Sequence, residues 1–193
     1  LMDLYKEMKK NGASKREFLI KAAGIEGIYV PSLYDIKYYE DGRIMSVTAL
    51  EGAPETVRKR IIKDFDKVYY PKELVVPFTD IVHNRVSVEV LRGCIRGCRF
   101  CQAGFLYRPF REKSAETVCG QAQVLCENTG YEELSLASLS TSDHSEIDGI
   151  IKGLIPYTEK EHINLSLPSL RVDNFSKELM DEIKKVRKSG LTF

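Results

Sequence analysis

Three cysteines close together in the sequence are the residues most able to do chemistry. The stretch CIRGCRFC contains Cys94, Cys98 and Cys101, separated by three and then two residues, in a chain with 5 cysteines. A disulfide uses two cysteines and a closed structural zinc site uses four ligands, so a group of three suits neither. Three thiolates on a cubane iron–sulfur cluster would leave one of its four irons without a protein ligand. Such an open coordination position distinguishes a catalytic metal centre from a structural one.

A zinc site is the alternative interpretation of the same cysteines. His83 or His144 could supply its fourth ligand. The other two cysteines, Cys119 and Cys126, lie on the apolar face of an expected helix, and we expect them to be small buried core residues.

The cysteine loop directly follows the first strand of a repeating pattern. Apolar runs at 85–91, 133–139 and 163–170 predict three strands, with a helix after each. Strands that alternate with helices form right-handed crossovers, so the pattern predicts an α/β fold with a parallel sheet.

Capping residues predict where the helices begin and end. Ser114 begins the first helix, which ends at Gly130. Asp143 and Glu146 predict a capping box at the start of the second helix, with Pro156 just beyond its end.

A third helix begun by Ser176 and a fourth strand at 191–193 would continue the strand–helix pattern.

The polar faces of the strands indicate the type of sheet. Each of the three strands has one polar or small face, formed by Ser87 and Glu89, Ser135 and Ala137, and Asn164 and Ser166. Parallel strands covered on both faces are nearly all apolar, so these faces favour a barrel or partial barrel with a wide interior. The functional site would lie at the C-terminal ends of its strands.

A small α+β segment precedes this pattern. Ser14 and Glu17 form a capping-box signature for a short helix, and Asp41-Gly42 between two extended runs predicts a hairpin. Residues 54–80 have three prolines and mixed charge, which is typical of a connecting segment.

Bulk properties describe an ordinary globular protein. The formal net charge is +1, which gives no global reason to expect nucleic acid or membrane. No apolar run approaches the ~20 residues of a membrane span, no signal peptide is visible, and free cysteines favour a cytoplasmic location. The chain begins with Leu1 and stops in an apolar segment, so we expect it to be a fragment of a longer protein.

The cysteine spacing, with the aromatic Phe100 before the last cysteine, resembles that of the radical S-adenosylmethionine (radical SAM) superfamily. The resemblance implies that Cys94, Cys98 and Cys101 bind a 4Fe-4S cluster whose free iron chelates S-adenosylmethionine. One electron would then release a 5′-deoxyadenosyl radical that abstracts hydrogen from substrate. It also implies a (β/α)6 partial TIM-type barrel, of which this chain is the N-terminal half, and a place for Phe100 near the adenine.

Longer stretches resemble one group within the superfamily. RGCIRGCRFCQAGFLYRPFR, ELSLASLSTSDHS and NLSLPSLRVD are similar to an uncharacterised bacterial family, related to methylthiotransferases, with a cobalamin-binding-like N-terminal region. The resemblance implies that 1–50 is the tail of that upstream domain, 51–85 a connecting segment and 86–193 the first half of the barrel. The cobalamin ligand pattern D-x-H-x-x-G is absent, since Asp143 and His144 are adjacent, so cobalamin itself is not expected from this chain.

The resemblance also implies residues that contact S-adenosylmethionine. Ser138 and Ser140 stand where the superfamily usually has a Gly-Gly-Glu-like segment for the amino group. Ser166 and Ser169 could reach the ribose, and Arg171 could grip a carboxylate in a bidentate manner. The alternatives are a plain Ser/Thr turn and a surface arginine.

The segment 92–113 is strongly basic. It has six basic residues against the single acid Glu112, and these are Arg92, Arg96, Arg99, Arg108, Arg111 and Lys113. The excess, above all Arg96, Arg99, Arg108 and Arg111, could tune the cluster potential or, with Phe105 and Tyr107 for stacking, hold RNA. Glu89 on the interior face is either a substrate contact or a paired structural carboxylate, and it needs a partner if buried.

The resemblance thus implies a radical SAM enzyme that acts on an unknown substrate, with RNA or a ribosomal component as one option. A flavodoxin- or ferredoxin-like protein would supply its electron. The alternative is a non-catalytic zinc or iron–sulfur module that presents a basic loop to nucleic acid or protein.

Overall fold

The computed structural model describes residues 1–171 and residue 173. The chain divides into two compact units, Leu1–Lys63 and Asp64–Phe193. The expected helix from Ser176 and the expected strand at 191–193 lie outside the described residues. The origin of residues 1–50 in a cobalamin-binding-like domain stays a prediction.

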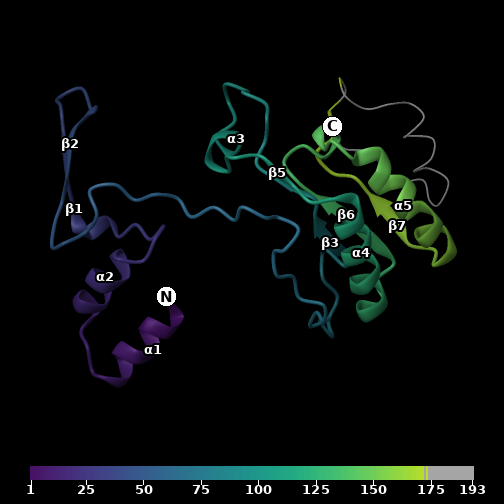
Figure 1. Cartoon of the computed structure of the whole chain (residues 1–193), viewed down its shortest axis with the longest axis horizontal. Coiled ribbons are helices and arrows are strands. Elements are labelled where there is room, and N and C mark those ends of the chain that lie inside the picture. Colours follow the sequence, from purple (N-terminus) through teal and green to yellow (C-terminus); the bar gives the residue numbers. More distant parts are fainter. Residues whose placement is uncertain (172, 174–193) are drawn as a thin grey trace. The chain divides into compact units, whose positions relative to one another are not determined.

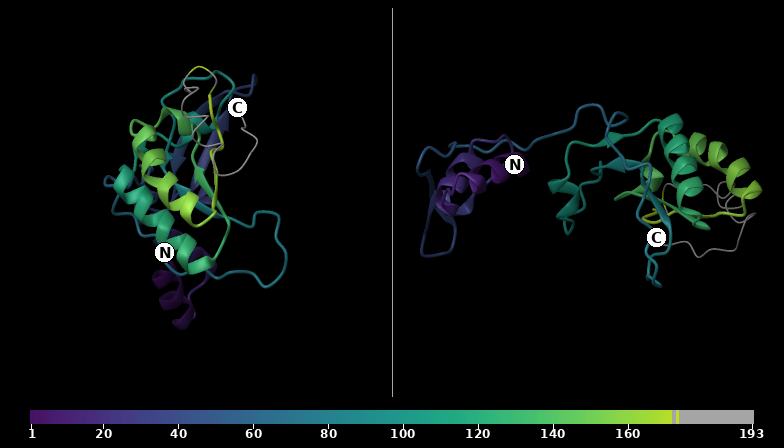
Figure 2. Two further views of the ribbon diagram at one scale, coloured as in Figure 1. Left: turned by 90° about the vertical axis from the view of Figure 1, so that its right-hand side faces the viewer. Right: turned by 90° about the horizontal axis from the view of Figure 1, so that it is seen from below.

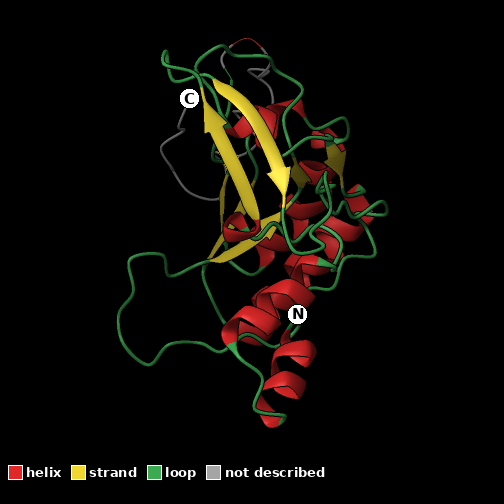
Figure 3. Ribbon diagram, turned by 90° about the vertical axis from the view of Figure 1, so that its left-hand side faces the viewer, coloured by secondary structure: helices red, strands yellow, loops and turns green. Residues whose placement is uncertain are grey.

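The first unit is a small α+β segment, as expected. Its elements are α1 (Met2–Lys10), α2 (Lys15–Ala23), the short 3-10 helix η1 (Pro31–Leu33), β1 (Tyr34–Tyr38) and β2 (Ile44–Ala49). The capping box of α2 is confirmed: Ser14 Oγ accepts from the Glu17 N–H, and the Glu17 carboxylate accepts from the Ser14 N–H at 2.7 Å. The hairpin is confirmed too, since β1 and β2 pair antiparallel (Figure 3).

The second unit contains the predicted strand–helix repeat. It consists of β3 (Val86–Glu89), β4 (Leu91–Arg92), α3 (Ala103–Leu106), β5 (Arg111–Glu112), α4 (Ala115–Thr129), β6 (Glu133–Ala137), the 3-10 helix η2 (Thr141–Asp143), α5 (Ile147–Lys160) and β7 (Asn164–Ser166). β3, β6 and β7 are neighbours in that order and pair parallel. This mixed α/β unit with a parallel sheet is consistent with part of a radical SAM-type barrel.

Side chains alternate between the two faces of the parallel sheet. The register places Ser87 opposite Ser135, and Ser135 opposite Ser166, so one polar row crosses all three strands. The apolar row beside it runs from Val86 through Leu134. The predicted polar face is therefore present.

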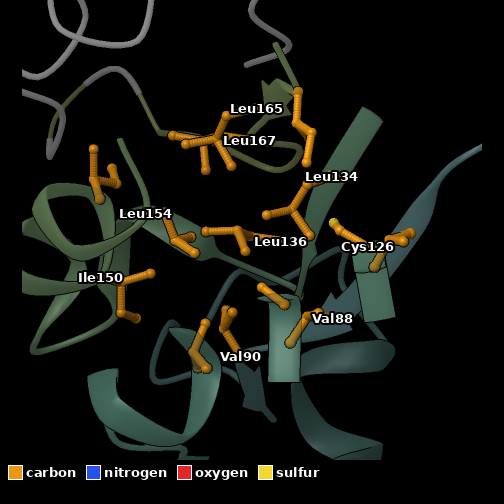
Figure 4. Packing of buried hydrophobic residues seen from close by; sticks show 14 of the residues in the cluster. Val88, Val90, Cys126, Leu134, Leu136, Ile150, Leu154, Leu165 and Leu167 are labelled. Carbon is orange, nitrogen blue, oxygen red and sulfur yellow. The ribbon is translucent and has the colours of Figure 1, made fainter. Parts of the chain in front are cut away.

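The apolar face of the sheet is covered by α4 and α5. These two helices pack against each other, and α4 packs on β3 (Figures 1 and 2). Figure 4 shows the side chains that gather between sheet and helices, including Val88, Leu134, Leu136, Ile150 and Leu154. Helix α4 begins and ends where the sequence predicts, with Ser114 as N-cap and Gly130 as left-handed C-cap.

Two predictions for the second helix are wrong. Asp143 does not begin α5, because it lies in η2 and the N-cap is Glu146, which makes no side-chain capping bond. Pro156 lies inside α5 rather than beyond it. Leu154 before the proline and Thr158 after it are both fully buried, so α5 packs on the core on either side of Pro156. None of the helices in the described residues has the length and apolar composition that a membrane crossing needs.

Candidate functional site: the cysteine loop and its surroundings

The cysteine loop leaves the first parallel strand and is closed at its base by two short strands. β4 and β5 pair antiparallel, with Leu91 opposite Glu112 and Arg92 opposite Arg111. Figure 1 shows the loop, with α3 in it, standing away from β3 and β6. The sequence thus places its three cysteines at the C-terminal end of β3, where βα loops build functional sites.

Gly93 makes the closure of the loop possible. Its φ is +90°, and a Cβ at this position would lie 2.7 Å from the Tyr107 carbonyl oxygen and 2.9 Å from that of Pro109. Only glycine tolerates both the left-handed conformation and this approach of backbone to backbone. Gly97 has no such constraint, because a Cβ there would meet nothing within 4 Å.

The three cysteines of the loop are half-buried, and two of them approach the same glycine. A Cβ on Gly104 of α3 would lie 3.8 Å from Cys101 Sγ and 3.9 Å from Cys94 Cβ. The Arg96 amide donates to Cys94 Sγ at 3.4 Å, and the Gly104 amide donates to Cys101 Sγ at 3.5 Å. Amide hydrogen bonds to cysteine sulfur stabilise thiolate and tune the potential of iron–sulfur clusters.

The cysteines fit an iron–sulfur cluster by their donor chemistry. They are three thiols on one loop with backbone amides directed at two of the sulfurs. Among the described residues, no three His, Cys, Asp or Glu side chains are already arranged to hold a metal ion. His144, a possible fourth zinc ligand, is buried and uses both ring nitrogens, donating from Nε2 to the Lys113 carbonyl and accepting at Nδ1 from the Glu146 amide.

Arg96 connects the cysteine loop to the loop after β6. Its guanidinium forms a bidentate ion pair with Asp143, whose side chain is 1% exposed. This hydrogen bond raises the pKa of Arg96. Ser140 Oγ, also buried, donates to Asp143 at 2.8 Å. Sequence reasoning missed this role of Asp143, although a carboxylate among hydroxyl residues after a strand, opposite an arginine-rich loop, could have indicated it.

The loop after β7 joins the same group of charges. Arg171 donates to both oxygens of Asp173 at 2.9 Å, and its amide donates to Ser142 Oγ. Asp173 also lies 3.9 Å from Arg96. Ser169 is exposed with φ +59°, and Ser166 is half-buried on β7. The loops after all three parallel strands therefore meet through Arg96.

A cleft of about 410 Å³ lies beside the base of the cysteine loop. Its lining residues are Glu89, Leu91, Arg92, Gly93, Tyr107, Ala137, Ser138 and Leu139. Glu89 accepts two hydrogen bonds from Arg92, at 2.7 and 2.6 Å, so this carboxylate has the partner that its position required. Ser138 Oγ lies 2.7 Å from Thr141 Oγ1. The cleft joins the ends of β3 and β6.

The basic residues of the loop have different surroundings. Arg99 is exposed, and so is its neighbour Phe100, at 92%. Arg108 stacks its guanidinium 4.6 Å from the Phe105 ring and donates to the Gly104 carbonyl.

Nearer the base of the loop, the basic residues are engaged with the protein itself. Arg111 donates to the Pro109 carbonyl, and Lys113 is buried and donates to Gln121. Much of the local positive charge is therefore used within the protein rather than presented to solvent.

Two further residues support the base of the loop and were not predicted. Phe65 is 3% exposed, and its ring centre lies 5.0 Å from the Arg92 guanidinium carbon. Asp66 accepts from the Ser114 amide at 2.7 Å, at the start of α4. No sequence pattern indicates them, since both lie in a segment without regular elements.

The fold and the site define a class of protein: a strand–helix repeat with a parallel sheet whose first βα loop has three thiols. The model of the radical SAM superfamily matches residues 88–193, more than half of the sequence, and the chain belongs to this superfamily. Its members typically use a 4Fe-4S cluster and S-adenosylmethionine.

Three curated proteins are similar to this chain. A tRNA-2-methylthio-N(6)-dimethylallyladenosine synthase of Chlorobium luteolum is 30% identical over 50% of this chain and 21% of its own length. The threonylcarbamoyladenosine tRNA methylthiotransferase MtaB of Treponema pallidum is 26% identical, over 61% and 25%. The uncharacterized protein MJ0966 of Methanocaldococcus jannaschii is 27% identical, over 65% and 30%. The chain thus spans between a fifth and a third of the length of these relatives.

Proposed function

We propose that Cys94, Cys98 and Cys101 bind a 4Fe-4S cluster and that the protein is a radical SAM enzyme. The observation that supports this best is the closed loop itself, with three thiols after the first parallel strand and amides that donate to two of the sulfurs. Such a cluster, when bound, supplies the electron that splits S-adenosylmethionine into methionine and a 5′-deoxyadenosyl radical, which abstracts hydrogen from substrate.

The surrounding residues would bind and orient S-adenosylmethionine. Ser138 lines the cleft at the end of β6, and its hydroxyl oxygen would accept a hydrogen bond from the ammonium group. Arg171 would contribute a guanidinium from the loop after β7, with Ser166 and Ser169 for ribose hydroxyls. Ser140 is buried against Asp143, so its contribution would be through the backbone.

The remaining residues of the site would contact the adenine or the substrate. The backbone of Phe100 would lie near the adenine. Glu89 and Arg92 form a paired group in the wall of the cleft, and such a pair can orient a polar substrate without an isolated buried charge. A flavodoxin- or ferredoxin-like protein would supply the electron, in a cytoplasmic setting that keeps the thiols reduced.

Anaerobic reconstitution with iron and sulfide tests this function in the full-length protein. We expect a brown protein with about four irons at this site that forms 5′-deoxyadenosine when dithionite and S-adenosylmethionine are added. C94A, C98A and C101A should each lose both properties, whereas C119A is the matched control because it removes a thiol from the packed helix α4. A colourless protein with one tightly bound zinc that depends on the same cysteines would support the non-catalytic module instead.

RNA is the substrate class that we propose. Exposed Arg99 and Arg108 lie among the exposed aromatic residues Phe100, Phe105 and Tyr107, an arrangement suited to phosphates and stacked bases. Two of the similar proteins are named for tRNA modification.

Binding of labelled tRNA at several salt concentrations tests this substrate class. The variant R99Q/R108Q should bind more weakly and lower the slope of log affinity against log salt by about 2, roughly one per phosphate contact. K152Q, which removes an exposed charge from α5, is the control. Equal affinity for wild type and R99Q/R108Q would argue against RNA at this loop.

A further inference from the structure

The segment 140–146, which follows β6, contacts the cysteine loop through Arg96. Within it, Asp143 holds the guanidinium of Arg96 in a bidentate ion pair while accepting a hydrogen bond from Ser140. Because the Asp143 side chain is 1% exposed, its charge depends on these partners. The bond spans 47 positions of sequence.

The same segment bonds to the exit strand of the loop. Ser145 donates from its amide and its hydroxyl to the two carboxylate oxygens of Glu112 in β5, both at 2.7 Å. His144 donates to the Lys113 carbonyl at 2.9 Å.

A last bond lies at the start of α4. Glu146 accepts from the Ala115 amide at 3.1 Å. Four consecutive residues, 143 to 146, therefore each make a hydrogen bond to the cysteine loop, to β5 or the residue after it, or to the start of α4.

The position of Arg96 makes this anchoring relevant to the thiols. Arg96 lies between Cys94 and Cys98, and its own amide donates to Cys94 Sγ. Fixing the side chain of Arg96 through Asp143 also limits where this amide can point.

The Arg96–Asp143 ion pair acts on the thiols through geometry rather than through its charge. Arg96 and Asp143 carry opposite charges in direct contact, so the pair adds little net charge beside the thiols. The pair can still fix the loop, because a buried bidentate contact has a defined geometry.

We propose that the segment 140–146 is a positioning segment for the cysteine loop and that Asp143, acting through Arg96, is its principal positioning residue. In this chain, side chains of the loop after β6 therefore hold the cysteine loop. They are not all available to bind S-adenosylmethionine. The proposal rests on the proposed function in one respect, namely that the thiols it orients are cluster ligands.

The first test uses metal-free, full-length protein, so that it does not depend on cluster assembly. D143N and R96Q each break the pair. We expect amide hydrogen exchange in 94–101 and alkylation of Cys94 to become about 5- to 30-fold faster in both variants, the change for loss of one such contact. The double variant R96Q/D143N should resemble the single variants, because all three lack the same interaction.

Controls separate positioning from charge and from unfolding. D143N removes a negative charge and R96Q a positive one, so a purely electrostatic effect on thiol reactivity would have opposite signs in the two variants. R99Q removes a neighbouring positive charge that the pair does not involve, and should leave exchange within about twofold of wild type. D143E keeps the carboxylate and should restore part of the protection, and exchange in α4 reports whether the fold is intact.

Two results would overturn the proposal: exchange and alkylation within twofold of wild type in both D143N and R96Q, or opposite changes in the two. After reconstitution, the cluster of D143N should show an altered electron paramagnetic resonance spectrum, with partial recovery in D143E. If the protein bound no cluster while the metal-free variants still lost protection, the proposed function would fail and the positioning role would stand.

Discussion

At the scale of single residues, the five cysteines of the chain fall into two chemical groups. Cys94, Cys98 and Cys101 are half-buried in the loop. Burial raises the pKa of Cys126 to about 11, and it raises the pKa of Cys119 as well. Since the thiolate is the reactive form, the raised pKa makes the thiols of Cys119 and Cys126 poorly reactive, and these two residues serve in packing.

This division predicts the pattern of alkylation in metal-free native protein. At pH 8, a thiol with a pKa of about 11, such as Cys126, is only ~0.1% thiolate. Iodoacetamide should therefore modify the three loop cysteines first and Cys119 and Cys126 only slowly, as followed by peptide mass spectrometry. In denaturant all five should react. Rapid modification of Cys126 in the native protein would contradict its place in the core.

Gly93 and Gly97 give a matched pair of substitutions in one loop. G93A places a methyl group against two backbone carbonyls at a φ of +90°, so we expect it to cost at least about 2 kcal/mol and to impair cluster retention. G97A meets nothing within 4 Å and should change stability by less than about 0.5 kcal/mol. Thermal unfolding and iron content after reconstitution measure both effects. A G93A protein as stable as G97A would show that the loop is not closed in this way.

At the scale of elements, the sequence predicts helix boundaries best where residues within a turn or two determine the local structure. Ser14 with Glu17 begins α2, and Ser114 with Gly130 bounds α4, because capping depends on neighbours within a turn or two. The strand pattern likewise predicts β3, β6 and β7 and their polar row.

Elements and contacts that depend on distant partners could not be predicted. Asp143 has the sequence pattern of a helix cap, but its carboxylate pairs with Arg96, 47 positions away. Pro156 has the pattern of a helix end, but α5 continues through it with Leu154 and Thr158 buried on either side, a tertiary contact that the local pattern does not contain. The two-residue strands β4 and β5 have no periodicity to detect. The candidate thiols were thus visible in the sequence, whereas the residues that fix them were not.

The contact between α4 and α5 gives a prediction at the same scale. A Cβ on Gly153 of α5 would lie 2.9 Å from Cys119 Sγ of α4. Overpacking of about 1–3 kcal/mol should therefore offset the ~1 kcal/mol that Ala gains over Gly in a helix, so G153A should be no more stable than wild type, whereas C119A/G153A should be more stable than C119A. Denaturant unfolding of wild type, both single variants and the double variant measures the coupling. If the changes in unfolding free energy of C119A and G153A simply added in the double variant, α4 and α5 would not approach so closely at this point.

At the scale of the whole molecule, the second unit begins before its first strand. The chain divides at 63/64, whereas the sequence pattern places the start of the barrel at residue 86. The ring of Phe65 lies within 6 Å of three cations, Arg92, Arg111 and Lys113, at 5.0, 5.9 and 5.4 Å. The connecting segment therefore contributes to the base of the cysteine loop.

Asp66 adds a contact at the start of α4. Its carboxylate accepts from the Ser114 amide, next to the hydroxyl cap that Ser114 itself provides to the Thr117 amide. Through Phe65 and Asp66, the same short stretch supports both the strand that leaves the loop and the helix that follows it.

These contacts predict where the second unit can be separated from the first. A chain that begins at Asp64 should keep its cysteine loop intact. One that begins at residue 86 loses the buried Phe65 ring, worth about 3–5 kcal/mol, and the Asp66 contact, worth about 1 kcal/mol. The substitutions F65A and D66A in the longer chain should together reproduce most of this loss, which controls for the other residues removed. Thermal unfolding and iron content report the difference, and equal values for the two chains would place the true start of the unit at residue 86, because Phe65 and Asp66 would then contribute nothing to it.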